Sequence, residues 1–248
     1  IRSYNPILTA SDEQVQQLVE EISRSERPVI YTGGGIINAN AAPQLLELAE
    51  KLYAPVTNTL MGLGGFPGTH PQFVGMLGMH GSYAANKTMA NADLIIALGA
   101  RFDDRVTNNV NKFCPDARVV HVDIDPTTLD KIINAHLAVQ GSLDVVLEQV
   151  LEQMAKVQLS LPDRTQWWQQ IEQWRFDSSD RYEKSNEVIK PQAVIEALYK
   201  VTNGEAYIAS DVGQHQMFAA QYYPFDKPRQ WVNSGGAGTM GFGFPAAM

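Results

Sequence analysis

The sequence is poor in the residues that build disulfides, metal clusters and membrane spans. Cys114 is the only cysteine among 248 residues, so an intrachain disulfide and a thiolate metal cluster are both excluded. No apolar run approaches the roughly 20 residues that a membrane helix needs. The histidines show no i,i+4 pair of the kind that binds zinc on a helix; they are His70, His80, His121, His136 and His215. We therefore expect Cys114 to be an inert structural thiol and the chain to have no membrane-spanning segment.

Basic residues are also scarce. The chain has 19 Lys and Arg against 27 Asp and Glu, a net charge of −8, and no block of basic residues. This balance argues against nucleic-acid binding and against binding to an anionic membrane surface. An anionic ligand would have to be held by local groups, such as backbone N–H groups at the start of a helix.

Strand-like and helix-like segments alternate between residues 14 and 156. Short apolar runs end in Gly or Asp, as in RPVIYTGGG, DLIIALGA and ARVVHVDID, and amphipathic segments separate them. This pattern predicts an α/β fold with a doubly wound parallel sheet, and we also expect a short helix over residues 126–133. Ligands of such sheets bind at the carboxyl ends of the strands, so we expect the functional residues there.

The rest of the chain suggests a linker and an incomplete second unit. Trp167, Ile171 and Trp174 lie at i, i+4 and i+7 of a polar helix, which favours a packing stripe over a base-stacking platform. We predict a nucleotide-binding domain over residues 1–158, a linker and helix over 159–189, and a truncated second α/β unit over 190–248. Because the sequence opens at Ile1 and closes just after a glycine-rich loop, we expect an internal piece of a larger enzyme.

The segment LGARFDDRV follows the strand DLIIALGA. Arg101 and Arg105 lie four residues apart, with Asp103 and Asp104 between them. Guanidinium groups suit a diphosphate or a carboxylate, and carboxylates suit ribose hydroxyls. The alternative is an exposed cluster whose charges pair only with one another.

Three other strand ends carry candidate residues. The glycines of TGGG allow close backbone approach to a ligand, although no GK[ST] follows as in a Walker loop. Asp123 stands where nucleotide-binding α/β folds place a ribose or adenine acceptor, whereas Asp125 before Pro126 suits a helix cap. Met79 in MLGMHG suits the flat face of a ring system, or equally a place in the core.

The second unit has two candidate loops. In SDVGQHQM, His215 can donate to a phosphate or act in proton transfer, or it can cap the next helix. Gly236, Gly238 and Gly241 spell GxGxxG between a strand and a helix, a weak match to a dinucleotide fingerprint. These glycines favour either close approach to an anion or a tight turn packed under a neighbouring helix.

Several strings together resemble the large, catalytic subunit of the acetohydroxyacid synthase (acetolactate synthase) family, of the bacterial type. They are GMLGMHG, LGARFDDRVTNN, HVDIDP, SDVGQHQMFAAQYY and SGGAGTMGFGFPAAM. The resemblance spans almost the whole chain. It implies that the chain is the central, FAD-binding domain followed by the start of a domain that binds thiamine diphosphate through Mg²⁺.

The resemblance also implies an activity. Enzymes of this family decarboxylate pyruvate and transfer the hydroxyethyl unit to a second 2-keto acid, pyruvate or 2-ketobutyrate, in the biosynthesis of isoleucine and valine. We expect a cytoplasmic homodimer of large subunits with a small regulatory subunit. The catalytic glutamate and the Mg²⁺ ligands of the family fall outside this sequence, so we expect the chain alone to be inactive and to contribute no metal ligand.

Site residues follow from the matching positions. The resemblance implies catalytic roles for Arg105, which would pair with a 2-keto acid carboxylate, and for Gln214 and His215. Positions matching FAD contacts are Gly33, Gly34, Thr59, Leu60, Leu77, Met79, His80, Gly99, Arg101, Asp103, Val106, Asp123 and Ile124. Those matching thiamine diphosphate contacts are Gly213, Gln214, His215, Gly238, Thr239 and Met240. The alternatives are a related enzyme of the glyoxylate carboligase or pyruvate oxidase type, and a non-catalytic FAD- or nucleotide-binding module.

Overall fold

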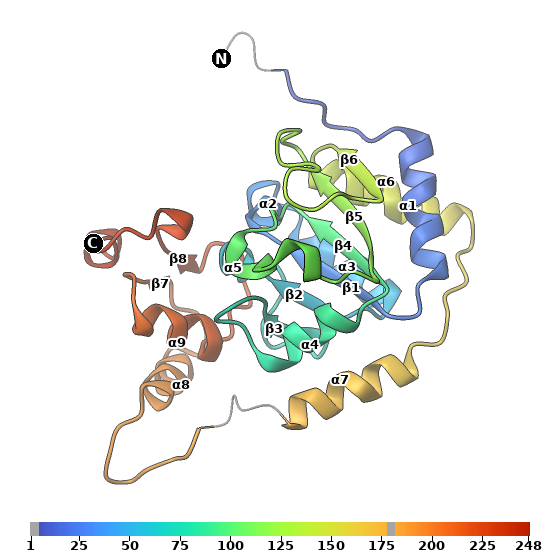
Figure 1. The fold of residues 1–248 in the computed structure, drawn as a ribbon. Coiled ribbons are helices and arrows are strands. Elements are labelled where there is room, and N and C mark those ends of the chain that lie inside the picture. Colours follow the sequence, from blue (N-terminus) through green and yellow to red (C-terminus); the bar gives the residue numbers. More distant parts are fainter. Residues whose placement is uncertain (1–4, 178–181) are drawn as a thin grey trace.

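A six-stranded parallel sheet forms the centre of the molecule in the computed structural model, which describes residues 5–177 and 182–248 (Figure 1). The strand order is β3-β2-β1-β4-β5-β6, and every pairing is parallel. The strands are β1 (Pro28–Thr32), β2 (Val56–Asn58), β3 (Phe73–Met76), β4 (Leu94–Leu98), β5 (Arg118–Asp123) and β6 (Leu137–Gln140). The expected doubly wound α/β fold is confirmed, and its order reverses between β1 and β4, where such sheets bind nucleotides.

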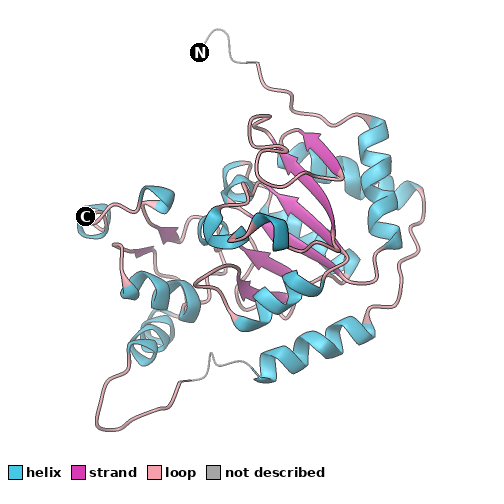
Figure 2. Ribbon diagram, viewed as in Figure 1, coloured by secondary structure: helices cyan, strands magenta, loops and turns pink. Residues whose placement is uncertain are grey.

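Helices cover both faces of the sheet (Figure 2). On one face, α1 (Asp12–Arg24), α3 (Ala42–Leu52) and α6 (Leu143–Lys156) bury their apolar sides against the sheet. On the other face lie α4 (Tyr83–Asn91) and the segment containing α5 (Asp104–Thr107) and η2 (Val110–Lys112). Along β1, Ile30 packs on the first face and Tyr31 on the second, because successive side chains of a strand point to opposite sides.

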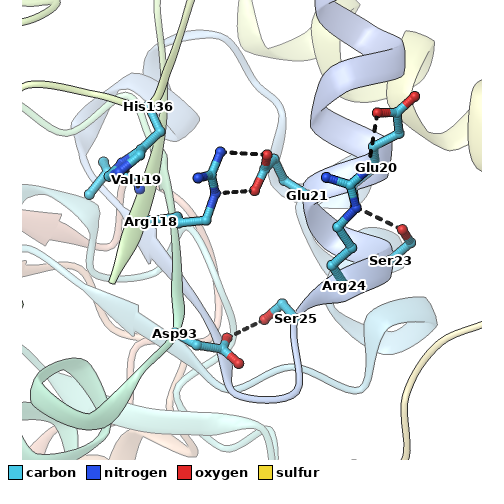
Figure 3. Close-up of polar contacts among 9 residues, drawn as sticks. All are labelled: Glu20, Glu21, Ser23, Arg24, Ser25, Asp93, Arg118, Val119 and His136. Carbon is cyan, nitrogen blue, oxygen red and sulfur yellow. Dashed lines mark hydrogen bonds and ion pairs between the residues drawn. The ribbon is translucent and has the colours of Figure 1, made fainter. Parts of the chain in front are cut away.

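Hydrogen bonds at the amino ends of the strands hold α1, and the segment that connects it to β1, against the sheet (Figure 3). Asp93 accepts the Ser25 hydroxyl at 2.5 Å and the backbone N–H groups of Glu26 and Arg27 at 2.9 Å each. Arg118 at the start of β5 donates to both carboxylate oxygens of Glu21 on α1, at 2.5 and 2.7 Å. These contacts lie opposite the edge where ligands are expected.

The helix expected over residues 126–133 is absent, and turns occupy that stretch. Asp125 accepts the N–H of Thr127 at 2.9 Å, and Asp130, with φ at +56°, accepts the N–H of Ala135 at 2.8 Å. Side chains that bond to nearby backbone compete with helix formation. Asp125 therefore caps a turn and not a helix.

Helix α7 (Thr165–Asp177) confirms the expected packing stripe. Trp167 and Ile171 are buried against the amino-terminal unit, and Trp174 meets Trp167 edge-on with 5.7 Å between ring centroids. The indole Nε1 of Trp167 donates to the carbonyl of Pro28 at 3.1 Å. The aromatic side chains are thus used for packing, and the helix lies beside α4.

The buried Arg164 immediately precedes α7. Its Nη2 donates to the carbonyls of Ile22 and Ser25 at 3.3 and 3.1 Å, and its Nη1 donates to the carbonyl of Leu52. These carbonyls lie at the ends of α1 and α3, where backbone acceptors lack partners within the helix. A single guanidinium therefore ties the connecting segment to two helices.

The second unit contains a short parallel pair of strands, β7 (Ile208–Ala209) and β8 (Trp231–Val232). Around them lie α8 (Pro191–Thr202), α9 (Gln214–Tyr222), η3 (Gly235–Ala237) and α10 (Gly243–Ala246). Two short elements, α2 (Gly34–Asn38) and η1 (Leu60–Gly62), complete the first unit. Over the described residues, no helix combines the length and the apolar character that crossing a bilayer requires.

Candidate functional site

The carboxyl edge of the sheet is extended by hydrogen bonds beyond the strands themselves. Gly33 N–H donates to Leu98 O at 3.0 Å, Thr59 N–H to Thr32 O at 2.8 Å, and Gly99 N–H to Val122 O at 2.9 Å. This continued pairing places the loops after β1, β2, β4 and β5 side by side. The residues expected to meet FAD on these loops therefore share one edge.

Two glycines of TGGG are needed by the chain's own packing. A Cβ on Gly35 would lie 2.6 Å from the Cα of Gly99, and a Cβ on Gly33 would lie 2.8 Å from the Cα of Ala100. Gly99 itself has φ at +60°, which favours glycine. Gly34 differs, because its nearest neighbour would be the Met61 Cβ at an ordinary 3.4 Å.

Phe102 anchors the segment LGARFDDRV. It is buried despite φ at +53°, with ring centroids 5.5 Å from Tyr31 and 5.1 Å from His121. Because Phe102 points inward, the flanking side chain of Arg101 is directed outward and is 65% exposed. Burial also lowers the pKa of His121, which favours a neutral ring beneath this segment.

Asp103 caps the start of α5 and contacts both arginines. Its carboxylate accepts the backbone N–H of Arg105 at 3.0 Å and pairs with the Arg101 guanidinium. Burial alone would raise its pKa, but the N–H of Arg105 and the nearby positive charges hold the pKa of Asp103 below its usual range. Asp103 is therefore an ionised acceptor at neutral pH.

Arg105 pairs with Asp104 at 2.6 Å, and both side chains are well exposed, at 67% and 75%. The self-paired arrangement considered from the sequence is thus present. An exposed pair of this kind contributes only about 0–1 kcal/mol, so it leaves the Arg105 fork free to exchange partners.

The loop MLGMHG packs against α5. Met79 N–H donates to Arg105 O at 2.8 Å, and Gly78, with φ at +109°, lies close to the same carbonyl. Within the loop Leu77 is buried, and Val106 packs against the same core cluster, whereas Met79 is 64% exposed. Met79 is therefore not a core side chain, which removes one of the two interpretations of the motif.

The remaining predicted contacts of the first unit lie along the same edge. Thr59 caps η1, its hydroxyl accepting the Gly62 N–H at 3.1 Å, and Leu60 follows it. Asp123 accepts the N–H of Asp125 at 2.9 Å, and the next residue, Ile124, is 37% exposed. The carbonyl of His80 accepts the Gln221 side-chain amide at 2.7 Å, which joins this edge to α9.

In the second unit, Gly213 precedes α9, and Gln214 and His215 are exposed in its first turn. The His215 ring lies against Gly213, since a Cβ there would be 2.9 Å from the ring carbon Cε1. The residue before the helix, Gly213, offers no side chain as a cap. His215 therefore lies within the helix and does not cap it.

The glycine-rich loop has two open positions. Gly238 and Gly241 have φ at +58° and +85°, and a Cβ on either would meet no atom within 4 Å. Between them, Thr239 N–H donates to the Ser234 hydroxyl at 2.9 Å, and Met240 is 80% exposed. These glycines are not packed under a helix, and their surroundings have space for a ligand.

The loop of the second unit touches the carboxyl edge of the first (Figure 1). A Cβ on Gly236 would lie 3.1 Å from Arg101 Nη2, and one on Gly235 would lie 2.9 Å from the Met61 sulfur. Motifs more than 100 residues apart in the sequence are thus brought together. Sequence reasoning missed Met61, which lies in TNTLMG without any recognisable spacing.

No group of three or more His, Cys, Asp or Glu side chains is arranged to hold a metal ion within residues 5–177 and 182–248. A site of that kind would need charged or imidazole ligands converging on one point. The candidate site of the described chain contains glycines, exposed methionines and arginine–aspartate pairs.

Family models match both units. The model of the thiamine pyrophosphate enzyme central domain matches residues 15–150, and the model of the thiamine pyrophosphate enzyme C-terminal TPP binding domain matches residues 211–248. The first match alone covers more than half of the chain.

Curated relatives are similar over the whole chain or nearly all of it. The acetolactate synthase isozyme 3 large subunit of Escherichia coli is 54% identical over 250 residues, covering 100% of this chain and 44% of the relative. The acetolactate synthase large subunit of Haemophilus influenzae is 49% identical, with coverage of 100% and 44%. The E. coli isozyme 1 large subunit is 44% identical, with coverage of 96% and 41%. The chain therefore spans less than half the length of these relatives.

The parallel sheet, the glycine-rich loop beside Arg101 and the two family matches all indicate the same family. The chain belongs to the thiamine pyrophosphate enzyme family and is a homologue of acetolactate synthase large subunits.

Proposed function

We propose that this chain is the FAD-binding unit and part of the thiamine diphosphate-binding unit of an acetolactate synthase large subunit. The whole enzyme would decarboxylate pyruvate and join the resulting two-carbon unit to pyruvate or 2-ketobutyrate. The observation that carries this proposal is the contact between the two units, which brings Gly236 beside Arg101 and Gly235 beside Met61. The motif proposed for thiamine diphosphate then lies beside the motif proposed for FAD, at the carboxyl edge of the sheet.

The first unit fits FAD. The exposed guanidinium of Arg101 suits a diphosphate, and the exposed Met79 offers an apolar surface for a ring system. Asp123 and Ile124 lie at the end of β5, where a ribose or adenine would be held. Gly33 and Gly99 would contact the cofactor through their backbone, because a glycine has no side chain to hold the ligand away from the loop. We propose a mainly structural role for the flavin.

The second unit fits thiamine diphosphate, which supplies an electron sink for decarboxylation when bound. Gly238 and Thr239 would lie along its rings, and Met240 is exposed enough to serve as an apolar support. Gln214 and His215 lie exposed at the start of α9, where backbone N–H groups and the helix dipole favour a diphosphate.

Arg105 would hold the carboxylate of a 2-keto acid. Its planar fork can make two parallel hydrogen bonds to a carboxylate, and its exposed partner Asp104 holds it only weakly. Further groups would come from the rest of the enzyme: the glutamate that activates the cofactor, the Mg²⁺ ligands, the second large subunit and a small regulatory subunit. Because the chain is a homologue of acetolactate synthase large subunits, we also propose a cytoplasmic location.

A chimera tests this function. The 250 aligned residues of the E. coli isozyme 3 large subunit are replaced by this chain, and acetolactate formation from pyruvate is measured with FAD, Mg²⁺ and thiamine diphosphate. We expect activity within about tenfold of the parent, since the two sequences are 54% identical over the replaced segment. A folded chimera that binds FAD but forms no acetolactate would contradict the proposal.

The chain by itself supplies the control. We expect it to bind FAD, seen as a flavin absorption spectrum that stays with the protein on gel filtration, and to form no acetolactate. Flavin binding without activity in the chimera would instead favour a non-catalytic flavin-binding module. Activity with glyoxylate in place of pyruvate would point to a related carboligase.

A further inference from the structure

Asp211, two residues after the end of β7, reaches across the second unit to the glycine-rich loop. Its Oδ1 accepts the backbone N–H of Val212 and of Gly241, both at 2.8 Å. Its Oδ2 accepts the N–H of Gly243 at 3.1 Å. The two glycines lie 30 and 32 residues further along the chain, so these bonds join the end of a strand to a distant loop.

The other hydrogen bonds described for this loop are local. Asn233 accepts the N–H of Gly235 at 2.7 Å, and Ser234 accepts the N–H of Thr239 at 2.9 Å. They shape the turn but do not fix its place relative to β7. Asp211 does so, because it follows β7 closely in the sequence and lies outside the loop.

Packing at Gly243 reinforces the connection. A Cβ on Gly243 would lie 2.5 Å from the backbone nitrogen of Asp211 and 2.9 Å from the carbonyl carbon of Ser210. The start of α10 therefore lies directly on the end of β7, and no side chain can separate them. Met240 immediately precedes the bonded Gly241 and is 80% exposed.

We propose that Asp211 is a positioning residue that fixes the segment from Gly241 to Gly243, and with it Met240, in the conformation that supports thiamine diphosphate. The inference rests on the proposed function for its ligand, while the positioning itself concerns this chain alone. The N–H groups of Val212, Gly241 and Gly243 hold the pKa of Asp211 below its usual range, with Val212 having the largest effect. This is expected for a carboxylate that accepts several hydrogen bonds.

Amide hydrogen exchange of the chain tests the positioning without any cofactor. In Asp211→Ala we expect the amides of Gly241 and Gly243 to exchange at least about tenfold faster, because both lose their acceptor. Asp211→Asn keeps one acceptor oxygen, so we expect one glycine to remain protected and the other to exchange faster. The amide of Gly141, which donates to Asp123 O at 3.0 Å in the first unit, reports on global unfolding and should not change.

Unchanged rates at both glycines in Asp211→Ala would overturn the proposal. If that variant fails to fold, Asp211→Asn decides: faster exchange at either glycine supports the proposal, and unchanged rates at both overturn it. Glu187→Gln, which removes an exposed carboxylate from the segment just before the second unit, is the control.

The chimera described above tests the consequence for the cofactor. We expect Asp211→Ala to raise the half-saturating concentration of thiamine diphosphate about tenfold, with kcat at saturation changed less than about twofold, and Asp211→Asn to lie between. An unchanged half-saturating concentration would show that the loop is fixed but not for this ligand. A chimera that binds no thiamine diphosphate before mutation would refute the proposed function, and the exchange experiment would still stand.

Discussion

Gly35 and Gly99 lie against each other so closely that a Cβ on Gly35 would be 2.6 Å from the Cα of Gly99. The contact joins the loops after β1 and β4, the two strands between which the order of the sheet reverses. Part of the glycine content at this edge is therefore explained by the approach of two backbones, and the remaining positions border the space proposed for a cofactor.

Gly35→Ala should destabilise the chain by about 1–3 kcal/mol, because the added methyl group forces the β4 loop outward. We expect a lower urea midpoint for unfolding and weaker FAD binding, since the displaced loop carries Arg101. Gly34→Ala is the matched control: its methyl group would meet the Met61 Cβ at 3.4 Å, and it lies in the same short helix. We expect that control to be neutral or to stabilise by up to about 1 kcal/mol. Equal destabilisation by both changes would contradict the role of the Gly99 contact.

Arg105→Lys in the chimera should raise the KM for pyruvate, because an ammonium group cannot form the two parallel hydrogen bonds of a guanidinium fork. We expect a rise on the order of tenfold, and no loss of stability beyond about 0.5 kcal/mol, since the pair with Asp104 is exposed. Asp104→Asn serves as the control, because it removes the ion pair and leaves the fork. If KM is unchanged in Arg105→Lys, the carboxylate of the substrate is held elsewhere.

The sequence predicted the sheet because buried parallel strands are short, apolar and ended by Gly or Asp, and this signal is local. It failed at residues 126–133, where the propensity for a helix lost to the carboxylates of Asp125 and Asp130 bonding to nearby backbone. It also gave no indication of Met61 or of the reach of Asp211 to Gly241, because those contacts depend on how distant segments meet. The motif glycines were visible in the sequence, but only the structure separates Gly35, which is packed, from Gly241, which is open.

Arg164→Ala should lower the free energy of unfolding by about 3 kcal/mol, because three carbonyls at the ends of α1 and α3 lose a charged donor while remaining buried. Burial lowers the pKa of Arg164 to about 10, so the guanidinium is still charged at neutral pH. Urea unfolding followed by tryptophan fluorescence measures the change. Arg24→Ala is the control, as the exposed Arg24 pairs with the half-exposed Glu20 at 3.7 Å (Figure 3), and we expect a change within about 0.5 kcal/mol. A loss below 1 kcal/mol in Arg164→Ala would show that solvent replaces the guanidinium.

Cys114 should react slowly with iodoacetamide in the native chain. Burial raises the pKa of its thiol to about 12, and its Sγ donates to the carbonyl of Met89 at 3.3 Å. Only the thiolate is nucleophilic, so at pH 8 we expect labelling at least about a hundredfold slower than for a free cysteine, whose pKa is about 8.5. The unfolded chain loses the thiol proton above about pH 8.5, whereas the native chain keeps it to about pH 12. The contribution of the protonated thiol to the free energy of unfolding is therefore fully present below pH 8.5 and is lost as the pH rises toward 12. Mass spectrometry of alkylated protein, native and in urea at pH 8, measures the ratio of the rates. Equal rates in the two states would mean that Cys114 is accessible as a thiolate, and the assignment of an inert structural thiol would then be wrong.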